Sequence, residues 1–106
     1  MSYDVTHLSG EMETGFPLER FGELLDQLES ADGEHTDVSV AHESDWSLSV
    51  FHSGYLVFQN LEEGGTRHMG PVDRDVALEL MQRLASGQVL EIRELDGWRA
   101  GYPPRG

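Results

Sequence analysis

The sequence contains no cysteine, and all seven of its basic residues are arginines. Without cysteine the chain has no disulfide, no zinc–thiolate site and no cysteine nucleophile. Without lysine it has neither a Schiff-base amine nor a P-loop lysine. Aromatic residues make up only 8% of the chain, too few to line a sugar-binding cleft as well as a core. These absences leave carboxylates, histidines and serines as the groups available for chemistry.

Long apolar segments are also missing. The longest unbroken run, Tyr55 to Phe58, is far shorter than the roughly 20 residues of a membrane-spanning helix. The first ten residues, MSYDVTHLSG, have neither the basic nor the apolar region of a signal peptide. We therefore expect a soluble cytoplasmic protein. Its 106 residues suit a single domain, residues 1–106, with one core.

The acidic residues are concentrated toward the amino end. Residues 1–34 contain nine acidic residues and one arginine, whereas residues 71–106 contain six acidic residues and five arginines. The whole chain has a net charge of −13, which repels nucleic acid and anionic membranes and attracts basic proteins. The charge distribution therefore predicts a basic protein partner, with no nucleic acid and no membrane.

Two segments have the apolar periodicity of helices. The first is expected from Pro17 to Ser30, with Thr14 as a candidate N-cap and Ala31-Asp32-Gly33 as its end. The second is expected from about residue 72 to 86, and Gly87, just after its end, is the expected C′ residue.

Runs with a period of two residues predict strands. Between the helices such runs lie at Val38–Val40, Trp46–Val50, Tyr55–Asn60 and Thr66–Met69, and their short connections indicate an antiparallel meander. A further run, Val89–Arg93, predicts a closing strand.

Residues 1–15 are polar, but Tyr3 and Val5 alternate with polar neighbours. They form either a short edge strand or a mobile tail. Strands that cluster together between helices indicate an α+β fold. We expect an antiparallel sheet of about four to five strands with two helices packed on one face.

No catalytic motif is present. A two-histidine, one-carboxylate metal site can be drawn from His35, His42 and a neighbour such as Asp37, but the histidines lack the spacing of known metal motifs. The serines include no G-x-S-x-G elbow. The segment Glu62-Glu63-Gly64-Gly65 is typical of a hairpin turn rather than a phosphate-binding loop. We predict no catalytic residue, no metal and no cofactor, and hence a protein that is not an enzyme.

The carboxyl-terminal segment combines aromatic and basic residues. Trp98 and Tyr102 lie close to Arg93, Arg99 and Arg105, a composition also found in sites for single-stranded nucleic acid. The net charge opposes that function. We expect instead that Trp98 covers the core and that the arginines pair with nearby carboxylates.

The first helix carries a stripe of carboxylates opposite its leucines. Like charges four residues apart, such as Glu19 and Glu23, cost a few tenths of a kcal/mol, so the stripe does not serve helix stability. It is either a solvated face or a docking surface for a basic partner. For the second alternative, the predicted partner-binding residues are Glu19, Glu23, Asp26, Glu29 and Glu34.

The segment from Trp46 to Trp98 resembles the carboxyl-terminal part of small immunity proteins of bacterial polymorphic-toxin systems. The resemblance rests on the strand pair WSLSVFHSGYLVFQN, a glycine-containing turn, and GPVDRDVALELMQRLASG before a final tryptophan. It covers about half of the chain. It implies a cytoplasmic α+β protein without enzymatic activity that binds a cognate toxin domain, on a surface that varies with the toxin.

Three hypotheses about function follow. The first is a non-catalytic acidic immunity or inhibitor protein that neutralises a basic toxin or enzyme domain. The second is an acidic adaptor or subunit of an unrelated complex. The third is a small metal-binding enzyme that depends on His35 and His42.

Overall fold

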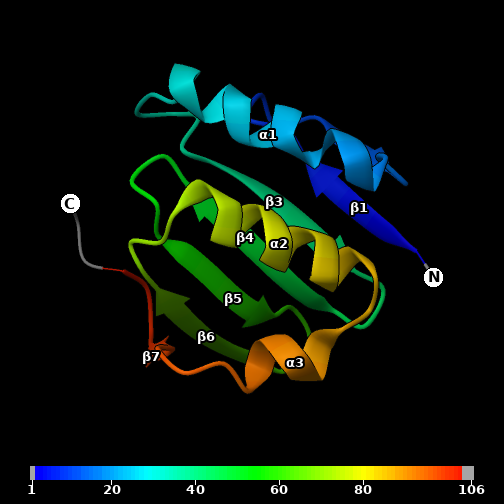
Figure 1. The fold of residues 1–106 in the computed structure, drawn as a ribbon, viewed down its shortest axis with the longest axis vertical. Coiled ribbons are helices and arrows are strands. Elements are labelled where there is room, and N and C mark those ends of the chain that lie inside the picture. Colours follow the sequence, from blue (N-terminus) through cyan, green and yellow to red (C-terminus); the bar gives the residue numbers. More distant parts are fainter. Residues whose placement is uncertain (1, 104–106) are drawn as a thin grey trace.

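This computed structural model describes residues 2–103 of the chain. Their strands form a single antiparallel sheet (Figure 1). Within these residues the sheet has seven strands in the order β2-β1-β3-β4-β5-β6-β7. They are β1 (Tyr3–Thr6), β2 (Met12–Thr14), β3 (Asp37–His42), β4 (Trp46–Phe51), β5 (Leu56–Asn60), β6 (Gly64–Met69) and β7 (Arg99–Ala100).

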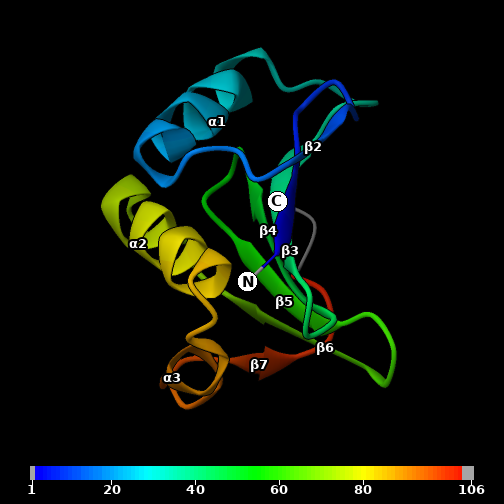
Figure 2. The same cartoon turned by 90° about the vertical axis from the view of Figure 1, so that its right-hand side faces the viewer.

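The helical segments pack alongside this sheet, and Figure 2 shows α1 and α2 on the same side of it. The segments are the 3-10 turn η1 (Leu18–Arg20), α1 (Phe21–Gln27), the 3-10 turn η2 (Leu28–Ser30), α2 (Arg74–Ala85) and α3 (Val89–Arg93). The predicted α+β class is therefore confirmed. The predicted strand number of four to five was too low, because short strands at both ends of the chain extend the sheet.

The central meander forms as its alternation predicted. Val38 of β3 pairs with Val50 of β4, and Val40 pairs with Leu48. All four side chains are buried. Directly opposite residues lie on the same face of an antiparallel sheet, so this row of apolar side chains forms the sheet's contribution to the core beneath the helices.

Tyr3 and Val5 belong to a strand, as one of the two predicted alternatives had it, but this strand is not at the edge of the sheet. Strand β1 lies inside the sheet between β2 and β3, and Val5 pairs with Val40 and is fully buried. The edge position is taken by β2, whose three residues are exposed. The hairpin of β1 and β2 is a long-range addition to the meander, which local periodicity does not reveal.

The first helical segment matches its predicted range but not its predicted cap. Helical geometry begins at Leu18 and ends at Ser30, with 3-10 turns at both ends of α1. Thr14 belongs to β2, where its hydroxyl donates a hydrogen bond to Asp4 Oδ1. It is therefore no N-cap, because the pairing of β1 with β2 removes it from the helix start.

The second helix was predicted closely. It runs from Arg74 to Ala85, and Gly87 follows with a φ of 85° and donates its N–H to the carbonyl of Leu84. A positive φ at this position favours glycine. Its apolar face, including Leu80, Met81 and Leu84, packs into the core.

The predicted closing strand at Val89–Arg93 was wrong, since these residues form the short helix α3. Only Ile92 of this helix is buried, and Leu90 is 64% exposed. A five-residue run with one buried side chain fits a helical turn as well as a strand. The sheet is closed instead by β7, which pairs with β6 through Arg67 opposite Ala100.

The core lies between the sheet and the two longer helices. Its largest fully buried side chains include Phe21 and Leu24 of α1, Leu48 of β4, Phe58 of β5 and Met81 of α2. No helix within residues 2–103 is long and apolar enough to cross a membrane.

Candidate functional site

Four of the five carboxylates predicted to bind a partner lie on the exposed side of the first helical segment, and the fifth, Glu34, lies in the loop that follows it. Glu19 is in η1, Glu23 and Asp26 are in α1, and Glu29 is in η2, and all four are exposed. Leu24, Leu25 and Leu28 point into the core from the same segment. The segment is thus amphipathic as predicted, with its charge directed outward.

Arginines neutralise part of this acidic surface. Arg20 donates two hydrogen bonds of 3.0 Å to Glu23, and this contact lowers the pKa of Glu23 below its ordinary value. Arg74 of α2 donates to Asp26 at 2.7 Å and to the carbonyl of Gly22 at 3.0 Å. Both pairs are exposed, so each contributes little stability.

The other three carboxylates carry the uncompensated charge. Within the described part of the chain, Glu19, Glu29 and Glu34 form no ion pair. Glu34 is in the loop after η2, where its N–H donates to Asp32 Oδ1 at 2.8 Å. Together with the N–H of His35, this hydrogen bond lowers the pKa of Asp32 and orders the loop.

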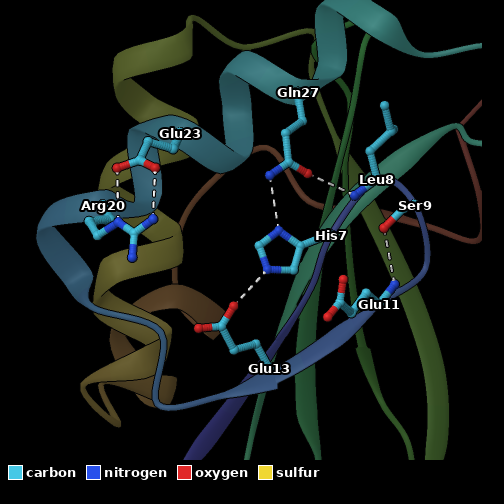
Figure 3. A network of polar contacts seen from close by, with 8 residues as sticks. All are labelled: His7, Leu8, Ser9, Glu11, Glu13, Arg20, Glu23 and Gln27. Atoms are coloured by element: carbon cyan, nitrogen blue, oxygen red, sulfur yellow. Dashed lines mark hydrogen bonds and ion pairs between the residues drawn. The ribbon is translucent and has the colours of Figure 1, made fainter.

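The β1–β2 hairpin adds further groups beside α1 (Figure 3). The ring of His7 lies between Gln27 of α1 and Glu13 of β2, with contacts of 2.9 Å at Nδ1 and 3.1 Å at Nε2. The N–H of Leu8 donates to Gln27 Oε1 at 3.0 Å, so the amide nitrogen of Gln27 faces His7. His7 therefore accepts at Nδ1 and donates from Nε2 to Glu13.

This network connects the acidic residues of the β1–β2 hairpin with the first helical segment. Glu11 and Glu13 border a cavity of about 510 Å³ at the hairpin, and Gln27 and Ser30 border it from the helical segment. Glu29 borders a different cleft of about 400 Å³, between the helices and the β4–β5 turn. The hairpin contact was missed from sequence because residues 7 and 27 are 20 positions apart and nothing local relates them.

The histidines do not form the metal site that the sequence allowed. Among residues 2–103 no group of three or more histidine, aspartate or glutamate side chains is placed to hold a metal ion. His35 contacts Asp32 at 3.3 Å, whereas His42 is buried at the end of β3.

A serine–histidine pair does occur, but without a carboxylate. His42 Nδ1 lies 2.8 Å from the hydroxyl of Ser44. His42 Nε2 is buried and has no hydrogen-bond partner among the described residues. A nucleophilic triad needs an acid on that second nitrogen to orient the ring, so this pair is not part of a triad within the described residues.

The predicted hairpin turn at Glu62-Glu63-Gly64-Gly65 lies where β5 meets β6: residues 61–63 form the turn, and the two glycines begin β6. Asn60 Oδ1 accepts the N–H groups of Glu62 and Glu63 at 3.0 and 2.7 Å. The pKa of Glu62 is raised by a hydrogen bond with the carboxyl of Asp45 and by the charge of that group. Two carboxyls in contact repel when both are ionised, and this repulsion favours the protonated form of Glu62. Asp45, Glu62 and Glu63 place three carboxyl groups at this end of the sheet.

One prediction about the carboxyl-terminal segment was right and one was wrong. Trp98 packs on the core, as expected. Arg93 and Arg99, however, form no ion pair with any residue in the described range, and Arg105 lies outside that range. Arg93 and Arg99 border a cavity of about 380 Å³ instead. The nearby Glu91 contacts Arg83 instead.

Comparison of the chain with protein-family models, with curated proteins and with solved structures finds no match.

Proposed function

We propose that this protein is a non-catalytic binding protein that uses an acidic surface to neutralise a basic partner, most simply as an immunity protein or inhibitor of a toxin or enzyme domain. The acidic surface comprises Glu19, Glu23, Asp26, Glu29 and Glu34. The resemblance of Trp46–Trp98 to immunity proteins supports the same proposal.

The observation that carries the proposal is the uncompensated charge on the first helical segment. Glu19 and Glu29 are exposed, form no ion pair within the described residues, and lie on a segment whose stability comes from its buried leucines. Like charges along a helix reduce its stability slightly. A protein of net charge −13 gains electrostatic steering toward a basic cleft from such a surface.

The ion pairs of Glu23 and Asp26 decide which residues are suitable for the test. Changing either residue also removes a local partner of Arg20 or Arg74, so a change in binding would have two causes. Neutralising Glu19 and Glu29 together, as Glu19→Gln and Glu29→Gln, removes charge without breaking an ion pair. The matched control is Glu43→Gln with Glu94→Gln, two exposed carboxylates elsewhere on the surface.

The experiment begins with capture of the partner from the native cell at low salt and its purification. Association rates are then measured by stopped flow over a range of ionic strength. We expect the double variant to associate about threefold to tenfold more slowly at low salt, with the difference disappearing at high salt. The control pair should stay within about twofold of the unchanged protein.

Two outcomes contradict the proposal. If both pairs slow association equally, the net charge matters but the acidic surface does not. If binding is insensitive to salt and to both pairs, the partner uses another surface. The partner's own activity separates an inhibitor from an adaptor, because only an inhibitor abolishes it at a one-to-one ratio.

A further inference from the structure

The only two tryptophans of the chain line the same cavity. It has a volume of about 380 Å³ and lies where the start of β4, the β5–β6 turn, the end of α3 and β7 meet. These segments are far apart in the sequence. This volume is within the range of small-molecule sites.

The indole rings of Trp46 and Trp98 form the flat apolar part of the cavity wall. The rings of Trp46 and Trp98 both stack on the fully buried Phe58, with centroid distances of 4.6 and 5.4 Å and interplanar angles of 16° and 24°. The indole N–H of Trp98 donates to the carbonyl of Ile92 at 2.8 Å. Both indoles are held in place and only half-buried, so ring surface remains open to the cavity.

Arginines form the charged part of the cavity wall. Arg67, Arg93 and Arg99 line the cavity together with a single carboxylate, Glu63. The guanidinium carbon of Arg93 lies 5.1 Å from the ring centroid of Trp46. Arg67 is directly opposite Phe58 in the sheet and so lies on the same face as that ring. Arg99 is opposite His68 and so points to the other face, which leaves Arg67 and Arg93 as the guanidinium groups beside the rings.

The three arginines differ from the other described arginines in having no carboxylate partner. Arg20, Arg74 and Arg83 each form an ion pair, whereas Arg67, Arg93 and Arg99 form none within residues 2–103. The chain has 20 acidic residues for seven arginines, so a lack of carboxylates does not account for this. The cavity therefore presents guanidinium groups that form no ion pair within the described residues, at an end of the sheet that also carries the carboxylates of Glu62, Glu63 and Asp45.

We propose that this cavity binds a small planar aromatic compound that carries an oxyanion, with nucleoside monophosphates as the representative class. The ring lies against the exposed indole surface, and the phosphate accepts hydrogen bonds from Arg67 and Arg93, whose planar guanidinium groups match oxyanions. The net charge of −13 disfavours a polyanion such as a nucleic-acid strand. The proposal is independent of the acidic surface on the first helical segment.

The two tryptophans make the cavity directly observable. Because no other tryptophan exists in the chain, indole fluorescence, excited at a wavelength that tyrosine does not absorb, reports on this site. Adenosine 5′-monophosphate is titrated into the protein while indole fluorescence is recorded. Adenosine supplies the ring without the anion, and inorganic phosphate supplies the anion without the ring. We expect saturable quenching by the monophosphate, and binding at least about tenfold weaker for either fragment.

Substitutions assign the binding to the arginines. Arg93→Gln and Arg67→Gln should each weaken binding of the monophosphate about tenfold or more, as expected for loss of a charge-assisted hydrogen bond. Arg20→Gln removes the same charge outside the cavity and should leave the affinity within about twofold. Circular dichroism verifies that each variant is folded.

The proposal is overturned if the monophosphate causes no saturable change up to about 10 mM, a concentration well above that needed for the weakest specific ligands of this size. It is also overturned if Arg93→Gln and Arg20→Gln behave alike. Tighter binding of a single-stranded oligonucleotide, with a steep salt dependence, would show a nucleic-acid site instead.

Discussion

Trp98 provides the sharpest test of how the carboxyl-terminal segment is held to the domain. Its indole N–H donates to the carbonyl of Ile92 at 2.8 Å, and its ring stacks on Phe58. Two substitutions separate these contacts. Trp98→Phe keeps a ring on Phe58 and removes the donor, whereas Trp98→Ala removes both.

The expected magnitudes follow from the contacts. The Ile92 carbonyl also accepts the N–H of Leu95 at 3.3 Å, so loss of the indole donor in Trp98→Phe should cost only about 0.5–1 kcal/mol. Trp98→Ala additionally loses a stacked pair worth about 1 kcal/mol. A half-buried indole covers roughly 100 Å², which adds about 2.5 kcal/mol. The alanine variant should therefore lose about 4–4.5 kcal/mol of unfolding free energy.

Urea denaturation followed by far-ultraviolet circular dichroism measures both variants. A matched control is Tyr102→Ala, an aromatic residue of the same segment that is 67% exposed and should change stability by less than about 0.5 kcal/mol. The reasoning fails if Trp98→Ala is no more destabilising than Tyr102→Ala. Equal losses for Trp98→Phe and Trp98→Ala would mean that the hydrogen bond, and not the stacked ring, holds the segment.

Two further predictions test the core and the acidic turn. Leu24→Ala, at a fully buried position, should lower the free energy of unfolding by about 2–5 kcal/mol, measured by urea denaturation. Leu90→Ala, at a position 64% exposed, should change it by less than about 0.5 kcal/mol. Similar losses for the two variants would contradict the assigned core. Because contact with Asp45 raises the pKa of Glu62, the folded chain binds that proton more tightly than the unfolded chain. Stability should fall as the pH rises from the ordinary carboxyl pKa through the raised one. Glu62→Gln should reduce this fall, and identical pH profiles for both proteins would refute the coupling.

The parts of the fold that were predicted well are those in which neighbouring residues decide the structure. The meander follows from strict alternation around Leu48 and Val50, and α2 follows from its apolar face and from Gly87. Each signal is contained within about 15 residues. Hydrophobic periodicity needs no knowledge of the partner element, only that one face will be buried.

The errors occurred where a short segment takes its structure from distant residues. Tyr3–Thr6 is an internal strand because it pairs with β3 on one side and with β2 on the other. Val89–Arg93 has too few buried residues to distinguish a strand from a helical turn, and Ile92 alone anchors it. In such segments tertiary contacts outweigh local propensity.

The two candidate sites also differ in whether neighbouring or distant residues form them. The exposed carboxylates of the first helical segment could be named from the sequence, because helical periodicity places them opposite buried leucines. The arginine cavity could not, because Trp46, Arg67 and Arg93 belong to separate elements. The expectation that arginines pair with nearby acids considered only neighbours in the sequence.

The amino-acid sequence by itself determined the amphipathic elements, the excess of negative charge and the chemistries that the missing cysteine and lysine exclude. All of these are properties of residue types and their local spacing. Only the tertiary structure decided which arginines remain without carboxylate partners and that two distant tryptophans share one cavity with them. The physical reason is that sheet pairing brings residues together across long stretches of chain, and no local pattern encodes which edges will meet.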